Sequence, residues 1–400
     1  MKNVDPSLVG FDISRLTRLT SSMKKYIDDG KIAGLNVLVS RDGKIAYHEN
    51  FGYSNIEDGS RIRTDTIFPI FSMTKPITVV AVMMLFEEGK FLLTDPISAY
   101  LPEFQDMRVV TDNSSDHPDF IDANRSITIK DLLTHTSGLS YGFYPDSYVD
   151  QKYREFDVFN ENETLEEGVK KIAIQPLVTQ PGEAWRYSYS NEVLAYLIEM
   201  FSDKPFDEFL ASRIFQPLGM VDTGFYLPTE KLKNLASFYI ASEENGFVEA
   251  GEEDVGEYSK RPTLTYGGTG LVSTISDFHR FSLMLLNRGR LEDECLLSRK
   301  SVSLITCNHL AKSHLPLEVG IHGTLIGMGF GFGVGVIVDA NQCGFLASNG
   351  SYGWGGGDTT LFWINPEESL IAIIMPNTFC DSYPDFYWKF LTLVHQAIVD

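Results

Sequence analysis

The sequence predicts an α+β fold, in which a discontinuous sheet domain holds an inserted, mainly helical domain. Two observations carry this prediction. Runs rich in β-branched and aromatic residues lie at both ends of the 400-residue chain, and most periodic stretches between about residues 72 and 310 have helical spacing. A chain of this length can bury a sizeable core and form two subdomains. We therefore expect residues 1–70 and 325–400 to form the sheet domain and residues 71–324 to form the helical one.

The N-terminal part begins with a helix and continues with a hairpin. Residues 12–29 have apolar side chains at helical spacing, and Gly30 follows as a stop signal. Residues 35–54 contain two β-rich runs on either side of a turn that includes Asp42 and Gly43. Such a turn between two β-rich runs is typical of an antiparallel hairpin.

The C-terminal part repeats the strand pattern. Residues 331–339 are expected to form a strand, residues 360–377 a strand–turn–strand unit, and a final helix is expected from about 383 to 399. The alternating glycines of 327–335 indicate a strand that another backbone approaches closely. The acidic segment 242–260 is expected to be an exposed loop. Helices are predicted over 73–88, 129–135, 164–174, 190–201, 205–213 and 277–288.

Composition excludes several classes of function. The chain has 33 basic and 54 acidic residues, a net charge of −21, which disfavours nucleic acid or an anionic membrane surface as a partner. No apolar run approaches the roughly 18 to 20 residues of a membrane span. The first residues lack an apolar signal core, so we expect a cytoplasmic protein. No C-x-x-C or H-E-x-x-H pattern occurs, and we expect neither a metal site nor a cofactor.

One short motif suggests a nucleophile, but its context argues against that role. Residues 138–142, G-L-S-Y-G, match the G-x-S-x-G pattern around the nucleophilic serine of α/β-hydrolases. That serine follows a strand and precedes a helix. Here the preceding segment is helical, since Thr128 and Asp131 resemble a capping box and Gly138 a C-terminal stop. We therefore expect Ser140 to lie in a turn and to have no catalytic role.

A better candidate nucleophile lies upstream, in the sequence Ser72-Met73-Thr74-Lys75. The residues after it are almost wholly apolar, which predicts a buried helix, and Pro76 is tolerated only in the first turn of that helix. Ser72 is then next to the positive end of the helix dipole, and its own N–H is among the free donors of the first turn. Lys75 lies three residues on, on the same face, where poor solvation favours its neutral form. Taken alone, the tetrapeptide could equally be the start of a surface helix.

Two further stretches add groups of the right chemistry. Tyr187 and Ser188 come just before a helix with apolar periodicity, and a tyrosine beside a lysine can accept the serine proton and donate to a leaving group. Residues 354–357, Trp-Gly-Gly-Gly, precede a predicted strand. Glycines there let a substrate lie against the strand edge and let a backbone N–H reach a developing oxyanion. Taken singly, each stretch could be a packed aromatic residue or a tight turn.

In this order and spacing, these three motifs resemble those of the serine β-lactamase-like hydrolases. That family includes class C β-lactamases, D-alanyl-D-alanine carboxypeptidases and family VIII carboxylesterases. Residues 131–139, 213–225 and 267–289 are similar to the family as well. The resemblance implies an antiparallel sheet flanked by helices, an all-α domain, and an active site in the cleft between them.

Two departures favour the esterases within this family. Tyr189 stands where β-lactamases and peptidases usually have asparagine, and Trp354 stands where they usually have a lysine or histidine that can bind a carboxylate. The Trp-Gly-Gly form is similar to that of family VIII esterases and of a related acyltransferase. Arg186, beside the tyrosine, could supply the missing charge if its side chain turned into the cleft.

The resulting hypothesis is a serine carboxylesterase that hydrolyses short-chain esters through an acyl-enzyme. Ser72 is the expected nucleophile, with Lys75 and Tyr187 as the proton-transfer groups. The N–H groups of Ser72 and Gly357 are expected to form the oxyanion hole. The expected substrate-binding residues are Tyr189, Trp354, Gly355 and Gly356. Three alternatives stay open: an acyltransferase with the same acyl-enzyme, an amide or β-lactam hydrolase, and a binding module without catalysis.

Overall fold

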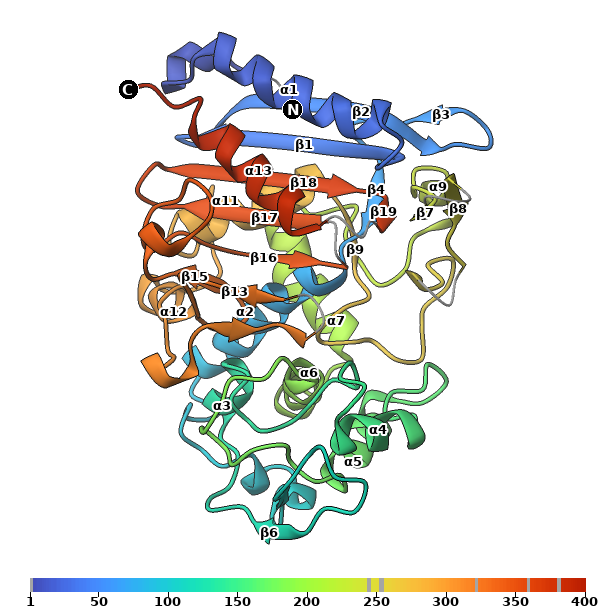
Figure 1. Ribbon diagram of the computed structural model, residues 1–400, viewed down its shortest axis with the longest axis vertical. Helices are drawn as coiled ribbons and strands as arrows, with labels where there is room; N and C mark the ends of the chain where they lie inside the picture. The colour runs from blue at the N-terminus through green and yellow to red at the C-terminus, as the bar shows by residue number, and fades with distance from the viewer. Residues whose placement is uncertain (1–2, 243–245, 252–254, 321–322, 358–359, 380–382) are drawn as a thin grey trace.

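The computed structural model describes residues 3–242, 246–251, 255–320, 323–357, 360–379 and 383–400. Its centre is an antiparallel sheet in the order β14-β15-β16-β17-β18-β1-β2-β3 (Figure 1). β1 pairs with β18 along its whole length, from Leu35 opposite Pro376 to Arg41 opposite Leu370. Strands from both ends of the chain thus form one sheet, as predicted. The sheet strands are β1 (Gly34–Arg41), β2 (Lys44–Asn55), β3 (Ser60–Arg61), β14 (Met328–Phe330), β15 (Gly335–Ile337), β16 (Tyr352–Gly356), β17 (Thr360–Asn365) and β18 (Leu370–Pro376).

The predicted N-terminal hairpin is present. Asp42 and Gly43 connect β1 to β2, and both have positive φ angles, 52° and 70°. Two left-handed residues in a row give the turn whose twist matches that of the flanking strands. The hairpin is therefore specified locally, by the residues of its own turn.

Helices cover both faces of the sheet. In Figure 1, α13 (Tyr383–His395) lies in front of the sheet and packs against α1 (Ile13–Asp28), whereas α11 (Ile275–Leu286) lies behind and packs against β18 and β1. The antiparallel sheet flanked by helices predicted from the resemblance is confirmed. Because α11 belongs to the stretch 71–324, that inserted stretch supplies part of the sheet's cover as well as the helical half. The domain boundaries at 70 and 324 remain a prediction.

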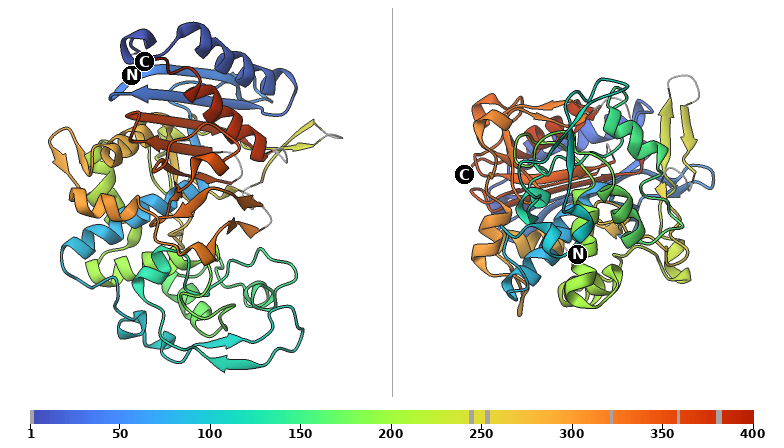
Figure 2. Two further views of the ribbon diagram at one scale, coloured as in Figure 1. Left: turned by 60° about the vertical axis from the view of Figure 1, so that its left-hand side comes forward. Right: turned by 90° about the horizontal axis from the view of Figure 1, so that it is seen from below.

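The helical half of the molecule is organised around α2 (Thr74–Glu87), which packs against α6 (Ser190–Ser202). Every α2 residue from Thr74 to Leu85 is buried, which explains why the sequence of this helix is apolar on all sides. Figure 1 shows α3 (Ile129–Leu133), α4 (Tyr148–Glu155) and α5 (Leu165–Ala173) together with α6 at one end of the sheet, and Figure 2 shows this group from two further sides. The remaining helices are α7 (Phe206–Leu210), α8 (Gln216–Leu218), α9 (Thr229–Leu232) and α12 (Arg299–Ile305).

Four local expectations need correction. Residues 331–334 form a turn between β14 and β15, so the expected strand begins only at Gly335. The predicted close approach of another backbone to these glycines is confirmed at Gly331, where an added Cβ would lie 2.1 Å from the carbonyl oxygen of Ile305. Residues 354–357 do precede a strand, β17, as expected, but Trp354, Gly355 and Gly356 also lie within a strand of their own, β16, which the sequence did not predict.

The other two corrections concern a loop and a helix end. Part of the expected acidic loop is a strand, since β8 (Gly246–Glu249) pairs with β7 (Tyr239–Ser242). Residues 243–245 and 252–254 of that loop lie outside the described residues. The helix before Ser140 ends at Leu133, earlier than Gly138. The reason is His135, which has a φ of 54° and turns the chain out of the helix. The remaining short strands are β4 (Ile67–Pro69), β5 (Arg108–Val110), β6 (Phe120–Asp122), β9 (Val272–Thr274), β10 (Arg290–Leu291), β11 (Glu294–Cys295), β12 (Leu317–Glu318), β13 (Thr324–Leu325) and β19 (Thr378–Phe379).

Across the parts of the chain that the structure describes, no helix combines the length and the apolarity needed to span a membrane.

Candidate active site

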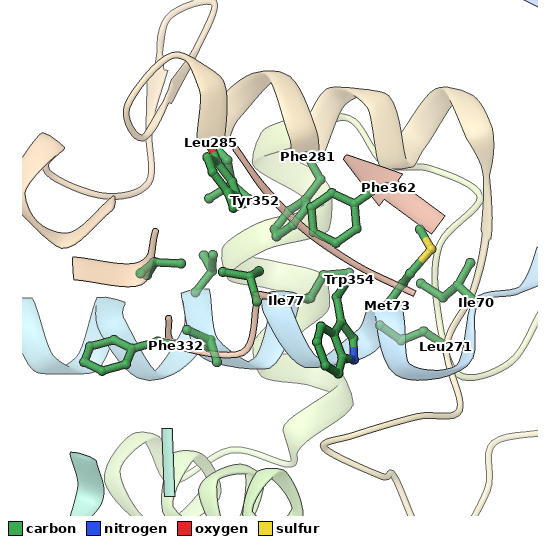
Figure 3. Packing of buried hydrophobic residues seen from close by; sticks show 14 of the residues in the cluster. Ile70, Met73, Ile77, Leu271, Phe281, Leu285, Phe332, Tyr352, Trp354 and Phe362 are labelled. Atoms are coloured by element: carbon green, nitrogen blue, oxygen red, sulfur yellow. The ribbon is translucent and has the colours of Figure 1, made fainter. Parts of the chain in front are cut away.

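Ser72 lies where the sheet meets the start of α2. A single 3-10 turn, Phe71–Met73, leads directly into the helix, and Pro76 is the third helical residue, where its missing N–H costs nothing. Ile70 and Met73 on either side pack into the apolar cluster drawn in Figure 3. The turn is thus anchored by buried neighbours, while the Ser72 side chain itself stays partly exposed.

The structure brings Lys75 onto the hydroxyl of Ser72. The Lys75 Nζ–Ser72 Oγ distance is 3.0 Å, and Nζ also donates to the carbonyl oxygen of Gly268 at 2.9 Å. The lysine side chain is fully buried. Its amine faces two aromatic rings, since Nζ lies 4.6 Å from the ring centroid of Tyr187 and 5.2 Å from that of Tyr141. A lysine held among rings and one carbonyl has little contact with water, which is the environment that a proton-accepting lysine requires.

Tyr187 lies in the segment that leads into α6. Its side chain is only 6% exposed, and its hydroxyl oxygen accepts a hydrogen bond of 3.3 Å from the indole N–H of Trp354. This bond leaves the tyrosine proton free to point elsewhere. Trp354 was expected to line the substrate pocket, but here it also orients a candidate proton-transfer group. In Figure 3 the Trp354 indole projects from the sheet toward the α2 side of the cluster.

The glycines after Trp354 lie against the turn that holds Ser72. A Cβ on Gly356 would lie 2.4 Å from the Ile70 carbonyl oxygen and 2.8 Å from the Ser72 nitrogen. A Cβ on Gly357 would lie 2.5 Å from the ring of Phe71, and Gly357 has a φ of 52°. Only residues without a side chain allow the chain to come this close, so Gly356 lies against the backbone of Ser72 and Gly357 lies against the ring of Phe71.

Tyr189 is part of an aromatic stack that includes Tyr187. It precedes α6, and its ring stacks on Tyr141 at a centroid distance of 4.2 Å and packs edge-on against Phe159 at 4.7 Å. Tyr141 in turn stacks on Tyr187 at 5.4 Å. Tyr141 therefore lies between Tyr189 and Tyr187 in the stack, and Tyr189 supports Tyr187 through it.

Ser140 is enclosed in an ionic network. Its Oγ donates to Asp150 Oδ2 at 2.7 Å and accepts from Arg186 Nε at 2.8 Å, and the residue is fully buried. Arg186 also pairs with Asp150 at 2.7 Å and stacks on Tyr144, with 3.6 Å from Cζ to the ring centroid. The arginine side chain is thus engaged away from Lys75, and the idea that it supplies a cation to the cleft is not supported.

Sequence reasoning missed two buried polar residues beside the candidate site. His135 donates or accepts a hydrogen bond of 3.1 Å between Nδ1 and Ser188 Oγ, and its ring centroid lies 5.0 Å from that of Tyr187. Burial, and then the charge of Lys75, holds the pKa of His135 well below its usual range. Its Thr-His-Thr-Ser context gave no signal of burial beside a tyrosine.

The second missed residue is Glu192, in the first turn of α6. It is fully buried, and its Oε1 accepts the N–H of Gly268 at 3.0 Å. Burial raises the pKa of the Glu192 carboxyl, and the nearby Lys75 opposes that rise. An acidic residue in the first turn of a helix is typical of a solvent-exposed side chain that interacts with the helix dipole. The sequence therefore gave no indication that Glu192 is buried.

The described side chains suggest no metal ligands, since no three His, Cys, Asp or Glu residues among them come together as a cation would require.

Comparison with known proteins identifies the family. The family model described as beta-lactamase matches residues 19–392. The chain belongs to the beta-lactamase family. Protein Rv1367c of Mycobacterium tuberculosis (strain H37Rv) is 32% identical over 363 residues, covering 89% of this chain and 88% of that protein. The lovastatin esterase of Penicillium rubens is 28% identical over 370 residues, covering 89% of this chain and 91% of the esterase.

A solved structure has a similar fold. EstCE1, described as a hydrolase with promiscuous acyltransferase activity, superposes with a TM-score of 0.78 at 25% identity, covering 97% of this chain and 99% of that one. The family resemblance predicted from the motifs is therefore confirmed. An esterase and a hydrolase with acyltransferase activity are among the proteins that this chain resembles, which supports ester hydrolysis or acyl transfer as the type of chemistry in this family.

Proposed function

We propose that the protein is a serine carboxylesterase that hydrolyses neutral short-chain esters through an acyl-enzyme on Ser72. The observation that carries the proposal is the 3.0 Å contact between the buried Lys75 amine and the partly exposed Ser72 hydroxyl at the start of α2. A serine is a weak nucleophile until a neighbouring base removes its proton. The buried lysine is the group in position to do so.

The proposed reaction has two halves. In acylation, the Ser72 Oγ–H proton passes to Lys75 Nζ as Oγ bonds to the ester carbonyl carbon. The carbonyl oxygen becomes an oxyanion beside the N–H groups of Ser72 and Gly357. The ester C–O bond then breaks, and the proton reaches the departing alkoxide through the Tyr187 hydroxyl. In deacylation, water takes the place of the alcohol and the same groups move its proton.

Acyl transfer to an alcohol is the second candidate function. It uses the same acyl-enzyme, with an alcohol in place of water as the acceptor. The supporting observation is the similarity to EstCE1, whose description names both activities. The partition between the two acceptors is measurable as the ratio of transfer product to acid when a simple alcohol is added.

Hydrolysis of β-lactams or of D-alanyl peptides has less support from this site. Such substrates carry a carboxylate, and the candidate cation positions offer none: Trp354 is uncharged, and Arg186 is paired with Asp150. A charge-assisted hydrogen bond contributes roughly 1.5 to 3 kcal/mol. Neutral esters do not need this contact.

The test is covalent labelling of the whole chain. A fluorophosphonate probe should modify one serine, and peptide mass spectrometry should place the label on Ser72. p-Nitrophenyl butyrate hydrolysis should disappear in proportion to labelling. A chain that hydrolyses no ester and takes no label, or takes it on Ser140, would rule the proposal out.

A further inference from the structure

Glu192 is a buried carboxylate that the proposed reaction leaves unused. It is fully buried in the first turn of α6, where burying an unpaired charge is costly. Oε1 is held by the Gly268 N–H at 3.0 Å, while Oε2 has no hydrogen-bond partner among the described residues. A buried carboxylate with backbone donors alone is poorly compensated, so its charge needs a partner at short range.

That partner is Lys75, and Gly268 connects the two. Gly268 donates its N–H to Glu192 and accepts from Lys75 Nζ at 2.9 Å through its carbonyl oxygen. A Cβ on Gly268 would lie 2.7 Å from Glu192 Oε1 and 2.9 Å from Lys75 Nζ, which together limit the separation of the two charged groups to 5.6 Å. Opposite charges at this distance in a buried place interact strongly.

Among the described residues, no other charged group interacts with Glu192. The titratable groups that interact with Glu192 are Lys75 and the phenols of Tyr141, Tyr189 and Tyr266. Burial raises the pKa of each phenol, that of Tyr266 to about 12, so all three are neutral at ordinary pH. His135 also interacts with Lys75, and burial lowers the pKa of its ring well below the usual range, so it is neutral as well. The carboxylate is the only one of these neighbours that can balance an ammonium on Lys75.

We propose that Glu192 is a positioning residue for Lys75, whose negative charge stabilises the ammonium that forms when Lys75 takes the Ser72 proton, and whose hydrogen bond to Gly268 fixes the carbonyl that holds the amine. Glu192 itself neither gains nor loses a proton in the step. Its part resembles that of a carboxylate that orients and stabilises a protonated general base. The inference rests on the proposed role of Ser72 and Lys75.

The test is Glu192→Gln, with Glu199→Gln as a matched control. Glu199 lies on the same helix, is only partly exposed, and likewise accepts one backbone N–H, from Phe206 at 2.9 Å, but it has no contact with Lys75. Glutamine at 192 keeps the acceptor for Gly268 and removes the charge. The readout is kcat and KM for p-nitrophenyl butyrate between pH 5 and 9.

In Glu192→Gln we expect kcat to fall by about 10-fold to 10²-fold at alkaline pH, with KM nearly unchanged, since a charge that acts in the transition state affects kcat. The acidic limb of the kcat/KM profile should move to lower pH by about one to two units, because an ammonium without its counter-charge loses its proton more easily. The loss should therefore shrink as the pH falls. Glu199→Gln should keep the limb of the unmodified chain.

A purely structural role predicts something else. A pH-independent loss in Glu192→Gln, or an unmoved acidic limb, would overturn the inference while leaving the esterase proposal intact. An unmodified chain that hydrolyses no ester would overturn the esterase proposal first. If Glu192→Gln does not fold by circular dichroism, Glu192→Asp carries the test: it keeps the charge and should keep the original limb, and a shifted limb there would contradict the inference.

Discussion

Ser72 and Ser140 each lie within hydrogen-bond distance of a cationic side chain, yet their surroundings differ in every respect that matters for reactivity. Ser72 contacts Lys75 at 3.0 Å and is partly exposed. Ser140 contacts Arg186 at 2.8 Å, is fully buried, and has its proton directed to Asp150 at 2.7 Å. A lysine can give up its proton and become a base, whereas an arginine in a protein cannot.

The difference shows what a nucleophile needs beyond a motif. Ser140 carries the pattern that suggests catalysis, G-x-S-x-G, but its buried hydroxyl already donates to Asp150 and accepts from Arg186, and these two residues form an ion pair. Ser72 carries the shorter pattern, yet its hydroxyl contacts a base and its backbone nitrogen lies against Gly356. Ser72 therefore has an accessible hydroxyl and a neighbouring base that can remove its proton, whereas the hydroxyl of Ser140 is buried and bonded to an ion pair.

The largest expected effect tests this comparison directly. Ser72→Ala should reduce p-nitrophenyl butyrate hydrolysis to the background rate, a loss on the order of 10⁴-fold or more. Ser140→Ala should keep most of the activity, because its hydroxyl reaches no substrate. The measurement is kcat/KM for both variants, with folding checked by circular dichroism. An inactive Ser140→Ala beside an active Ser72→Ala would reverse the assignment.

A single substitution can give Ser72 the kind of cation that Ser140 has. Lys75→Arg keeps a positive charge and a hydrogen-bond donor near the hydroxyl but removes the proton acceptor. We expect kcat to fall by about 10² to 10⁴, the usual contribution of a general base. Lys75→Met, which removes the charge at similar length, is the control and should be impaired to a similar degree. Substantial activity in Lys75→Arg would mean that the lysine acts only through its charge.

Much of this layout could be predicted from local sequence signals. The Asp42-Gly43 turn, the apolar run of α2 and the position of Pro76 each depend on residues close in sequence. The pairing of Ser72 with Lys75 follows from helix geometry, since the two are three residues apart. Patterns of this kind act within one element, so the sequence displays them.

The rest depends on contacts between distant segments. Glu192 and Gly268 are 76 residues apart, and nothing near either one indicates that they meet. Residues 354–357 precede β17 as expected, but the sequence did not indicate that pairing with β17 makes Trp354, Gly355 and Gly356 a strand as well. The sequence also suggested that Arg186 could turn toward the cleft, whereas Asp150, in α4, holds it. In each of these three places, a contact with another segment of the chain determines the structure.

A smaller effect concerns the charge of the substrate. If Arg186 stays in the Ser140 network, no cation is available for a carboxylate near Ser72. 4-Nitrophenyl hemisuccinate, a carboxylate analogue of the neutral butyrate, should then react about 10-fold to 10²-fold more slowly in kcat/KM. A chromogenic cephalosporin and a D-alanyl-D-alanine peptide should also be poorer substrates than the butyrate. Equal or faster turnover of any of these anions would place a cation in the cleft.

The smallest expected effect is on stability, and it should invert the ranking of the two serines. Ser140→Ala leaves Asp150 without one donor and the Arg186 Nε without its acceptor in a buried place, which costs roughly 1 to 3 kcal/mol of unfolding free energy. Ser72→Ala removes one acceptor from Lys75, which keeps the Gly268 carbonyl, so its stability should change by no more than about 0.5 kcal/mol. Urea unfolding of the two variants and the unmodified chain measures both values. A stable, inactive Ser72→Ala beside a weakened, active Ser140→Ala is the expected pair; a Ser72→Ala variant as destabilised as Ser140→Ala would mean that Ser72 also serves the fold, and the contrast between the two serines would fail.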